Sequence, residues 1–270
     1  MSESQADVFD EKFSVFARWQ TSPWGRLRYT TAAANLTAHL SAGPLDILDV
    51  GGGNGLDALE LAARGHHVTI ADISEQSLAE AYRGRARGLD DRVTTRHASI
   101  DALGDEFGRG CFDVLLCHNL IQYLPDPAGV IATLAVPLRV SGVLSVIAPN
   151  ADADPLLSAV RGLDPGGALG MLDAPTRYSV AYETTTRACY PNHVKADLAT
   201  AGFEVIAHRG IRTVCDYIVD DDRKSDPEFY RQLERLELAL AARVPYIHLA
   251  RFSTPPSAHR CGILRALHCY

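Results

Sequence analysis

Residues 45–55 read LDILDVGGGNG, a short apolar run that ends in a glycine-rich loop. The apolar and β-branched character of residues 46–50 predicts a buried strand, and the glycines begin where a helix should start. Apolar residues at helical spacing follow in residues 57–64, and residues 67–72 read as a second strand that ends on an acid. This order predicts a βαβ unit with two parallel strands and a right-handed connection.

The glycine-rich loop has the chemistry of a nucleoside-binding site. Gly51, Gly53 and Gly55 let the backbone turn sharply and approach a ligand, and the first free N–H groups of the next helix point into the same space. Asp72, at the tip of the neighbouring strand, can accept hydrogen bonds from both hydroxyls of a ribose. We therefore expect a nucleoside pocket where the two strands end.

The spacing of the loop distinguishes two classes of nucleoside-binding protein. The dinucleotide fingerprint G-x-G-x-x-G requires a third small residue, and counting from Gly51 that position holds Leu56. The loop is G-x-G-x-G instead. With Asp49 before it and Asp72 after it, the loop resembles that of the class I methyltransferases that use S-adenosylmethionine (SAM). The resemblance implies SAM as the cofactor and leaves a dehydrogenase as a distant alternative.

Composition is that of an ordinary globular enzyme. The chain has 270 residues, 47% of them hydrophobic and 22% charged, and a formal net charge of -7, which argues weakly against a polyanionic partner. The cysteines form no C-x-x-C pair and no metal-ligand spacing, so we expect reduced thiols in a cytoplasmic protein and no metal site. No signal segment or membrane-spanning run is evident.

Further apolar runs extend the pattern into an α/β fold. We expect a Rossmann-like sheet of seven strands, mainly parallel, with helices on both faces, an N-terminal helical cap and a lid insertion after the fifth strand. The other strands are expected at residues 93–97, 111–117, 143–148, 203–215 and 261–268. The expected divisions are a cap at 1–40, the SAM-binding core at 41–150, a substrate lid at 151–191 and the C-terminal part of the core sheet at 192–270.

Two basic side chains fall where the pocket is expected. His118 follows the fourth strand, which adjoins the first at the switch point of the sheet, so it should contact cofactor or substrate unless it is a structural histidine. Arg28 lies in a helix before the first strand and could donate to the cofactor's carboxylate. The alternative for Arg28 is a solvated helix arginine.

A closer resemblance covers nearly the whole chain. The motifs follow the order seen in the bacterial methyltransferases that act on carboxymethoxyuridine in tRNA anticodons; they lie at residues 11–13, 25–28, 51–55, 63–66, 72–74, 118, 212–217 and 245–251. The resemblance implies SAM contacts at Arg28, Gly51, Gly52, Asp72, Ser99, Ile100 and His118. Further cofactor-binding candidates are Asp49, Gly53, Gly55 and Ile73. It also suggests that Asp101 meets the adenine amine, although Asp101 could equally cap the helix that starts there.

The same resemblance makes Arg212 and Arg251 candidates to hold an anionic acceptor, unless each pairs with an acid such as Asp216. Further acceptor candidates are Tyr178 in the lid, by stacking, and His248. A general base is needed only if the acceptor must lose a proton. The base candidates are His118, Tyr217, Tyr246 and His248.

The lid departs from the tRNA enzymes. Their pattern carries a lysine-rich run there, whereas residues 170–177 here hold one arginine and one acid, GMLDAPTR. Phosphate contacts dominate nucleic-acid affinity, so we expect a small-molecule acceptor, with an aromatic ring among the options. A tRNA methyltransferase and a non-catalytic SAM-binding protein are the alternatives. The sequence does not reveal the methylated atom or the oligomeric state.

Overall fold

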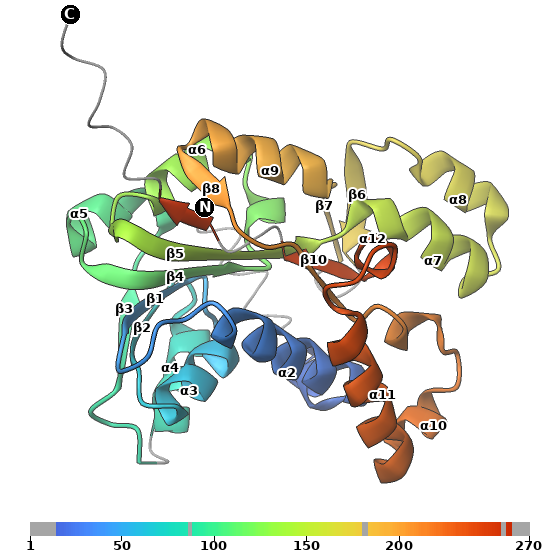
Figure 1. Ribbon diagram of the computed structural model, residues 1–270, viewed down its shortest axis with the longest axis horizontal. Helices are drawn as coiled ribbons and strands as arrows, with labels where there is room; N and C mark the ends of the chain where they lie inside the picture. Colours follow the sequence, from blue (N-terminus) through green and yellow to red (C-terminus); the bar gives the residue numbers. More distant parts are fainter. Residues whose placement is uncertain (1–14, 86–87, 180–182, 255–257, 261–270) are drawn as a thin grey trace, which may run out of the picture.

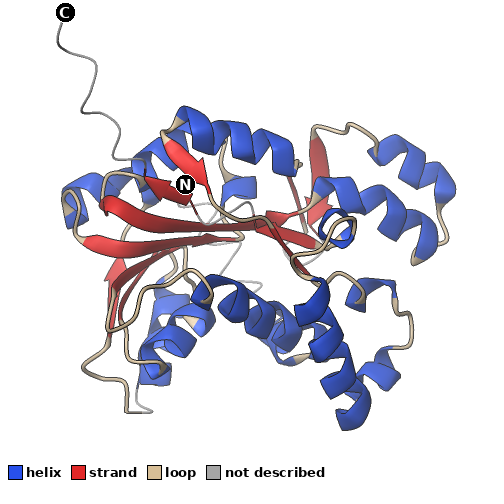
Figure 2. Cartoon of the chain, viewed as in Figure 1, coloured by secondary structure: helices blue, strands red, loops and turns tan. Residues whose placement is uncertain are grey.

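The computed structural model of the protein describes residues 15–85, 88–179, 183–254 and 258–260. One large mixed sheet crosses the molecule, and helices cover both of its faces (Figures 1 and 2). Its strands are β1 (Asp46–Val50), β2 (His67–Asp72), β3 (Val93–His97), β4 (Phe112–His118), β5 (Leu138–Pro149), β8 (Phe203–Val205), β9 (Arg209–Ile211), β10 (Phe252–Thr254) and β11 (Ala258–Arg260).

The strand order confirms the predicted Rossmann-like topology. The order across the sheet is β3-β2-β1-β4-β5-β10-β9, with β11 placed between β5 and β8. Strands β1 to β5 pair in parallel, and β10 and β11 run antiparallel to β5. Because β1 lies between β2 and β4, the chain connections leave β1 in opposite directions, and this switch point opens a crevice at the carboxyl ends of the strands.

Two hydrophobic cores hold the helices against the sheet. On one face, α2 (Pro23–Thr37), α3 (Leu56–Ala63) and α4 (Glu75–Arg85) bury residues such as Leu36, Leu61 and Leu78 against β1 and β2. On the other face, α5 (Leu103–Phe107), α6 (Pro127–Leu134) and α9 (Pro191–Thr200) pack around Leu103, Ile131 and Leu198.

The C-terminal edge of the sheet differs from the expected continuous strands. Residues 203–215 form two short strands, β8 and β9, and the antiparallel partners of β5 are β10 and β11. Residues 255–257, between β10 and β11, lie outside the described residues. The strand expected at 261–268 lies outside the described residues.

The remaining elements lie beside the open end of the sheet. Between β5 and α9 the chain forms the helices α7 (Asp154–Val160) and α8 (Pro165–Met171) and the antiparallel hairpin β6 (Thr176–Ser179) and β7 (Thr184–Arg187). This region is the predicted lid. The other elements are α10 (Asp221–Ser225), α11 (Pro227–Leu240), α12 (Tyr246–Leu249), and the 3-10 turns η1 (Ile100–Ala102), η2 (Ile121–Tyr123), η3 (Ala151–Ala153) and η4 (Cys215–Tyr217).

In the described part of the chain, no helix is long and apolar enough to cross a bilayer.

Candidate active site

A cavity of about 520 Å³ opens at the carboxyl ends of β1, β2 and β4. Most of the predicted cofactor residues line it, namely Arg28, Asp49, Gly51, Gly52, Gly53, Asp72, Ile73, Ile100 and His118. Among the described residues, Gly55, Ser99 and Asp101 do not line it. Of the predicted acceptor and base residues, Tyr178, Arg212 and Arg251 line the cavity, whereas Tyr217, Tyr246 and His248 do not. The individual roles of all these residues stay predictions.

Two glycines of the loop are required for different physical reasons. Gly53 has a φ of 56°, in the left-handed region, and no atom lies within 4 Å of the position a Cβ would occupy. A Cβ on Gly52 would instead lie 2.6 Å from the carboxylate carbon of Asp49. Gly53 is thus required by backbone conformation, and Gly52 by the close approach of a buried acid.

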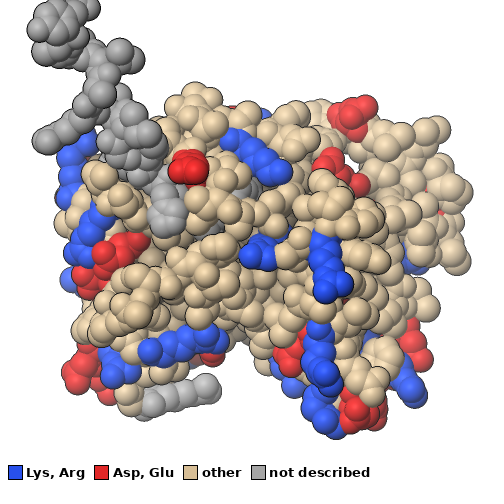
Figure 3. Space-filling view, viewed as in Figure 1, with Lys and Arg blue, Asp and Glu red and all other residues tan. Residues whose placement is uncertain are grey.

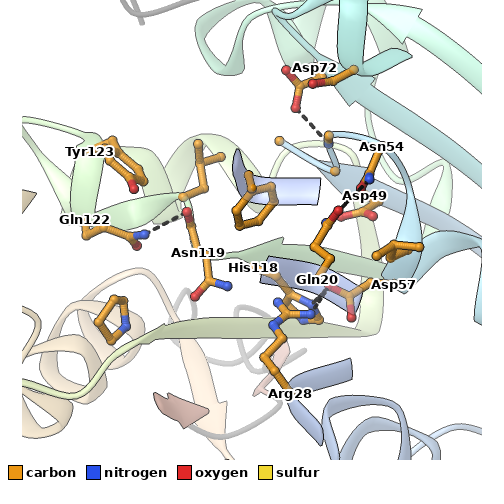
Figure 4. Close-up of a pocket in the computed structure, with 18 of the residues that line it drawn as sticks. Gln20, Arg28, Asp49, Asn54, Asp57, Asp72, His118, Asn119, Gln122 and Tyr123 are labelled. Atoms are coloured by element: carbon orange, nitrogen blue, oxygen red, sulfur yellow. Dashed lines mark hydrogen bonds and ion pairs between the residues drawn. The ribbon is translucent and has the colours of Figure 1, made fainter. Parts of the chain in front are cut away.

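Asp72 fixes the loop from the neighbouring strand. One carboxylate oxygen accepts the Gly53 backbone N–H at 2.9 Å, and the other accepts the Ser74 N–H at 2.8 Å (Figure 4). Because the carboxylate is held at the rim of the cavity, its remaining lone pairs can receive the two hydroxyls of a ribose.

Asp49 is a buried acid with an unsatisfied oxygen. Its side chain is 2% exposed, and its Oδ2 atom has no hydrogen-bond partner in the protein. Burial, with the nearby Asp57 carboxylate, raises the pKa of Asp49 well above its ordinary value. Asp49 also lines the cavity, so an ammonium group bound there would lie beside this carboxylate. A SAM molecule with its ribose at Asp72 carries such a group on its amino-acid part, so the residues present fit SAM.

Arg28 is held by a chain of hydrogen bonds that sequence reasoning missed. Its Nη1 donates to Asp57 Oδ2 at 2.5 Å, and the same oxygen is 3.0 Å from His118 Nδ1. The other ring nitrogen of His118 lies 2.9 Å from Ser145 Oγ. Figure 4 shows Arg28, Asp57 and His118 converging on one side of the cavity. The only sequence signal for Asp57 was its place in the first turn of the helix that follows the glycine loop.

The pKa values of Asp57 and His118 follow from their burial and from the charges beside them. Burial alone would raise the pKa of Asp57, but Arg28 and His118 outweigh it and hold that pKa well below its usual range. Burial lowers the pKa of His118, although Asp57 opposes the shift. Asp57 is therefore ionised, and His118 is neutral near neutral pH.

The N-terminal helix closes the cofactor side of the cavity. Residues 15–21 are helical, and the Gln20 side chain exchanges two hydrogen bonds with Asn54 of the glycine loop, at 3.0 and 2.7 Å. Gln20 also donates to the Tyr29 hydroxyl at 2.7 Å. Phe16 and Trp19 of the same helix line the cavity. The helix thus covers the loop through side-chain amides rather than through backbone pairing.

Three arginines of the cavity wall alternate with two acids in a row, here called the arginine ladder: Arg177, Asp154, Arg251, Asp216 and Arg212. Arg177 from β6 makes two 2.8 Å hydrogen bonds to Asp154, and Arg251 Nη1 reaches the same carboxylate at 2.9 Å. Arg251 Nε lies 3.8 Å from Asp216, which accepts from Arg212 Nε at 3.0 Å. Burial and the neighbouring Arg177 lower the pKa of Arg251.

The predicted base candidates are engaged elsewhere. Both ring nitrogens of His118 have partners, and the Tyr217 hydroxyl donates to the Leu249 carbonyl at 3.0 Å. His248 packs edge-on against His208, with ring centroids 6.1 Å apart, and Tyr246 is 40% exposed. Among the described residues, no group of three or more His, Cys, Asp and Glu side chains is placed to hold a metal ion.

Comparisons with known proteins agree with the chemistry of the cavity. Residues 47–142 match the family described as a methyltransferase domain. Over 259 residues the chain is 30% identical to the tRNA 5-carboxymethoxyuridine methyltransferase of Escherichia coli strain K12, an alignment that covers 93% of this chain and 95% of that protein.

Solved structures share the fold. A possible histamine N-methyltransferase of Thermotoga maritima matches with a TM-score of 0.65 and 13% identity, over 94% of this chain and 99% of that one. The 1,6-didemethyltoxoflavin-N1-methyltransferase of Burkholderia thailandensis, solved with S-adenosylhomocysteine (SAH) bound, matches with a TM-score of 0.60 and 20% identity, over 97% of this chain and 91% of that one. The sequence relationship extends along nearly the whole chain, which therefore belongs to the family of SAM-dependent methyltransferases that includes the tRNA 5-carboxymethoxyuridine methyltransferases.

Proposed function

We propose that the enzyme transfers the methyl group of SAM to a carboxylate oxygen of a small, anionic acceptor. The observation that carries the proposal is the arginine ladder in the wall of the cavity. A volume of about 520 Å³ is within the range of pockets for small ligands.

The ladder has one positive charge more than it has negative charges. Its guanidinium groups belong to Arg177, Arg251 and Arg212, and its carboxylates to Asp154 and Asp216. Arg251 uses Nη1 for a hydrogen bond and reaches Asp216 only at 3.8 Å, so it keeps donors for a ligand. A carboxylate is the group that a planar, charged fork of N–H donors holds best.

The engaged base candidates support the same acceptor. When bound, SAM supplies a methyl carbon that its sulfonium has already activated. The protein's task is to hold the acceptor oxygen in line with that carbon and to exclude water, which amounts to a high effective concentration. A carboxylate is already deprotonated near neutral pH, so no side chain has to remove a proton. The positions of Tyr217 and His118 are compatible with this chemistry.

The lid favours a small acceptor over a nucleic acid. Its one arginine in residues 170–177, Arg177, lies against Asp154 in the cavity wall. Lysine occurs in the sequence only at positions 12, 195 and 224, and Lys224 is buried. On the face drawn in Figure 3, basic side chains are scattered with acidic ones among them. A surface that binds nucleic-acid phosphates is expected to carry a continuous basic patch, and this face does not show one.

The second candidate is a tRNA methyltransferase. It is favoured by the 30% identity to the Escherichia coli tRNA enzyme over 93% of this chain. The carboxymethoxyuridine for which that enzyme is named also carries a carboxylate. The two candidates therefore differ in the size of the acceptor.

The test is methyl transfer from labelled SAM, offered in parallel to undermodified bulk tRNA and to a low-molecular-weight extract of the source organism. We expect label in the small-molecule fraction and none in tRNA. Label in tRNA would overturn the small-acceptor proposal in favour of the second candidate.

A further inference from the structure

Four polar side chains from four elements form one continuous hydrogen-bonded chain behind the cofactor side of the cavity. Arg28 comes from α2, Asp57 from the first turn of α3, His118 from the end of β4 and Ser145 from β5. Arg28, His118 and Ser145 are each less than 10% exposed. A buried polar chain of this kind is stable only if each of its members is satisfied.

We propose that Asp57, His118 and Ser145 are positioning residues that hold Arg28 as the receptor for the carboxylate of SAM, and that His118 is a fixed neutral tautomer rather than a general base. The proposal rests on SAM binding and not on the identity of the methyl acceptor.

The proton positions follow from the partners of each atom. An ionised carboxylate only accepts hydrogen bonds, so the His118 nitrogen that faces Asp57 Oδ2, Nδ1, must carry the proton. In a neutral ring the other nitrogen, Nε2, is an acceptor, and the Ser145 hydroxyl donates to it at 2.9 Å. Both ring nitrogens are therefore occupied, and neither can take a proton from a methyl acceptor.

The groups around His118 keep it neutral. Arg28, from α2, is a cation close to the same carboxylate and opposes a second positive charge on the ring. Asp57 from α3 favours the charged ring, but burial outweighs it. Asp49 on β1 and Tyr29 on α2 complete the titratable groups whose charges act on Arg28 and Asp57.

Arg28 is left with donors for a ligand. Asp57 takes one N–H of the guanidinium, and the Tyr29 ring lies 4.5 Å from its central carbon, so the group is fixed in orientation. Asp57 takes only one of the five guanidinium N–H groups, and Arg28 lines the cavity. The amino-acid part of SAM carries an ammonium and a carboxylate on the same carbon. With the ammonium beside Asp49, we expect the carboxylate to face the Arg28 guanidinium.

The experiment compares two ligands that differ only in the amino-acid part. SAH contains that part, and 5′-methylthioadenosine has the same adenosine and sulfur but lacks it. Replacing Asp57 with asparagine (Asp57→Asn) should weaken SAH binding by about 10- to 100-fold, the loss expected for a charge-assisted hydrogen bond. The affinity for methylthioadenosine should not change, and calorimetry measures both ligands without any methyl acceptor.

The matched control is Glu60→Gln, an exposed acid on the same helix that pairs with Arg64. It should change neither affinity. Equal weakening of both ligands by Asp57→Asn would mean that Asp57 only maintains the fold. Unchanged SAH binding would mean that Asp57 does not act on Arg28. Either result overturns the proposal.

The tautomer has its own readout in the ligand-free protein. Imidazole ¹⁵N resonances of His118, identified by their loss in His118→Gln, should show a proton on Nδ1 and none on Nε2 at pH 7. Ser145→Ala should shift the Nε2 resonance and leave the Nδ1 proton in place. An Nε2–H tautomer or an imidazolium at pH 7 would contradict the assignment.

Discussion

Replacing Asp49 with asparagine should stabilise the ligand-free protein while weakening its affinity for SAM. Asp49 is 2% exposed, its Oδ2 has no partner, and burial with the neighbouring Asp57 raises its pKa well above the ordinary 3.8. Asparagine keeps the shape of the side chain and removes the charge. The substitution therefore measures two effects of this carboxylate separately: the loss of folding stability caused by its burial and its contribution to SAM affinity.

The magnitude follows from the charge on the unsatisfied carboxylate, which asparagine removes. A buried polar group without a partner costs about 1–3 kcal/mol. In a protein of this size each kcal/mol shifts the melting temperature by about 2–4 °C, so Asp49→Asn should melt about 2–12 °C above the wild type. The loss of a charge-assisted bond to the ligand's ammonium should weaken SAM binding by about 10- to 100-fold.

The pH dependence has a definite sign. Because the folded-state pKa of Asp49 is raised, its contribution to stability is fully present below pH 3.8 and is lost as the pH rises through the folded-state pKa. Asparagine does not titrate, so the difference in melting temperature between the variant and the wild type should grow as the pH rises from 3.8 toward the folded-state pKa of Asp49. Wild-type SAM affinity should rise over the same range, as Asp49 ionises.

The assays are thermal unfolding of the ligand-free proteins at a series of pH values and calorimetric titration with SAM. Asp105→Asn, an exposed acid on α5, is the control and should change neither quantity. A variant that melts at or below the wild type at every pH, or that binds SAM equally well, would refute the assignment of Asp49.

Further predictions concern the loop, a buried glutamate and the arginine ladder. Gly53→Ala should cost about 1–2 kcal/mol in urea unfolding, because its φ is 56° with open space around a Cβ. Gly52→Ala should instead impair SAH binding in calorimetry, since its Cβ would lie 2.6 Å from a buried carboxylate carbon. Glu237→Gln should lower the free energy of unfolding by about 2–4 kcal/mol in urea, because the buried carboxylate accepts three backbone N–H groups of residues 213–215; a change below about 0.5 kcal/mol would contradict this role. Arg251→Met should raise the KM for the acceptor about 10- to 100-fold without changing SAM affinity, whereas the control Arg139→Met, at the other end of the sheet, should leave the kinetics unchanged.

The part of the fold that local patterns govern could be predicted from the sequence. The apolar runs at 46–50, 67–72 and 93–97 form β1, β2 and β3 at those bounds, because each strand buries apolar side chains in the hydrophobic cores. The edge of the sheet was harder to predict. Strands β8 to β11 are each three residues long, too short to show a hydrophobic period.

The polar arrangements of the site could be predicted only in part. The glycines of the loop and Asp72 could be predicted, because they belong to one strand–helix–strand unit that the sequence pattern shows. Asp57 and His118 are 61 positions apart, and Arg251 and Asp154 are 97 apart, so no spacing rule joins them. The fold makes these pairs by bringing the ends of different strands to one edge of the sheet.

The most direct test of the central claim is the chemical stability of the transferred methyl group. A carboxyl methyl ester is cleaved by mild alkali and releases its methyl group as volatile methanol, whereas methyl groups on nitrogen, on carbon or in an ether remain attached. After transfer from labelled SAM to the low-molecular-weight fraction, we predict that the label becomes volatile in alkali and that Arg251→Met forms far less of this product. Label that stays bound after alkali would contradict a carboxylate acceptor held by the arginine ladder.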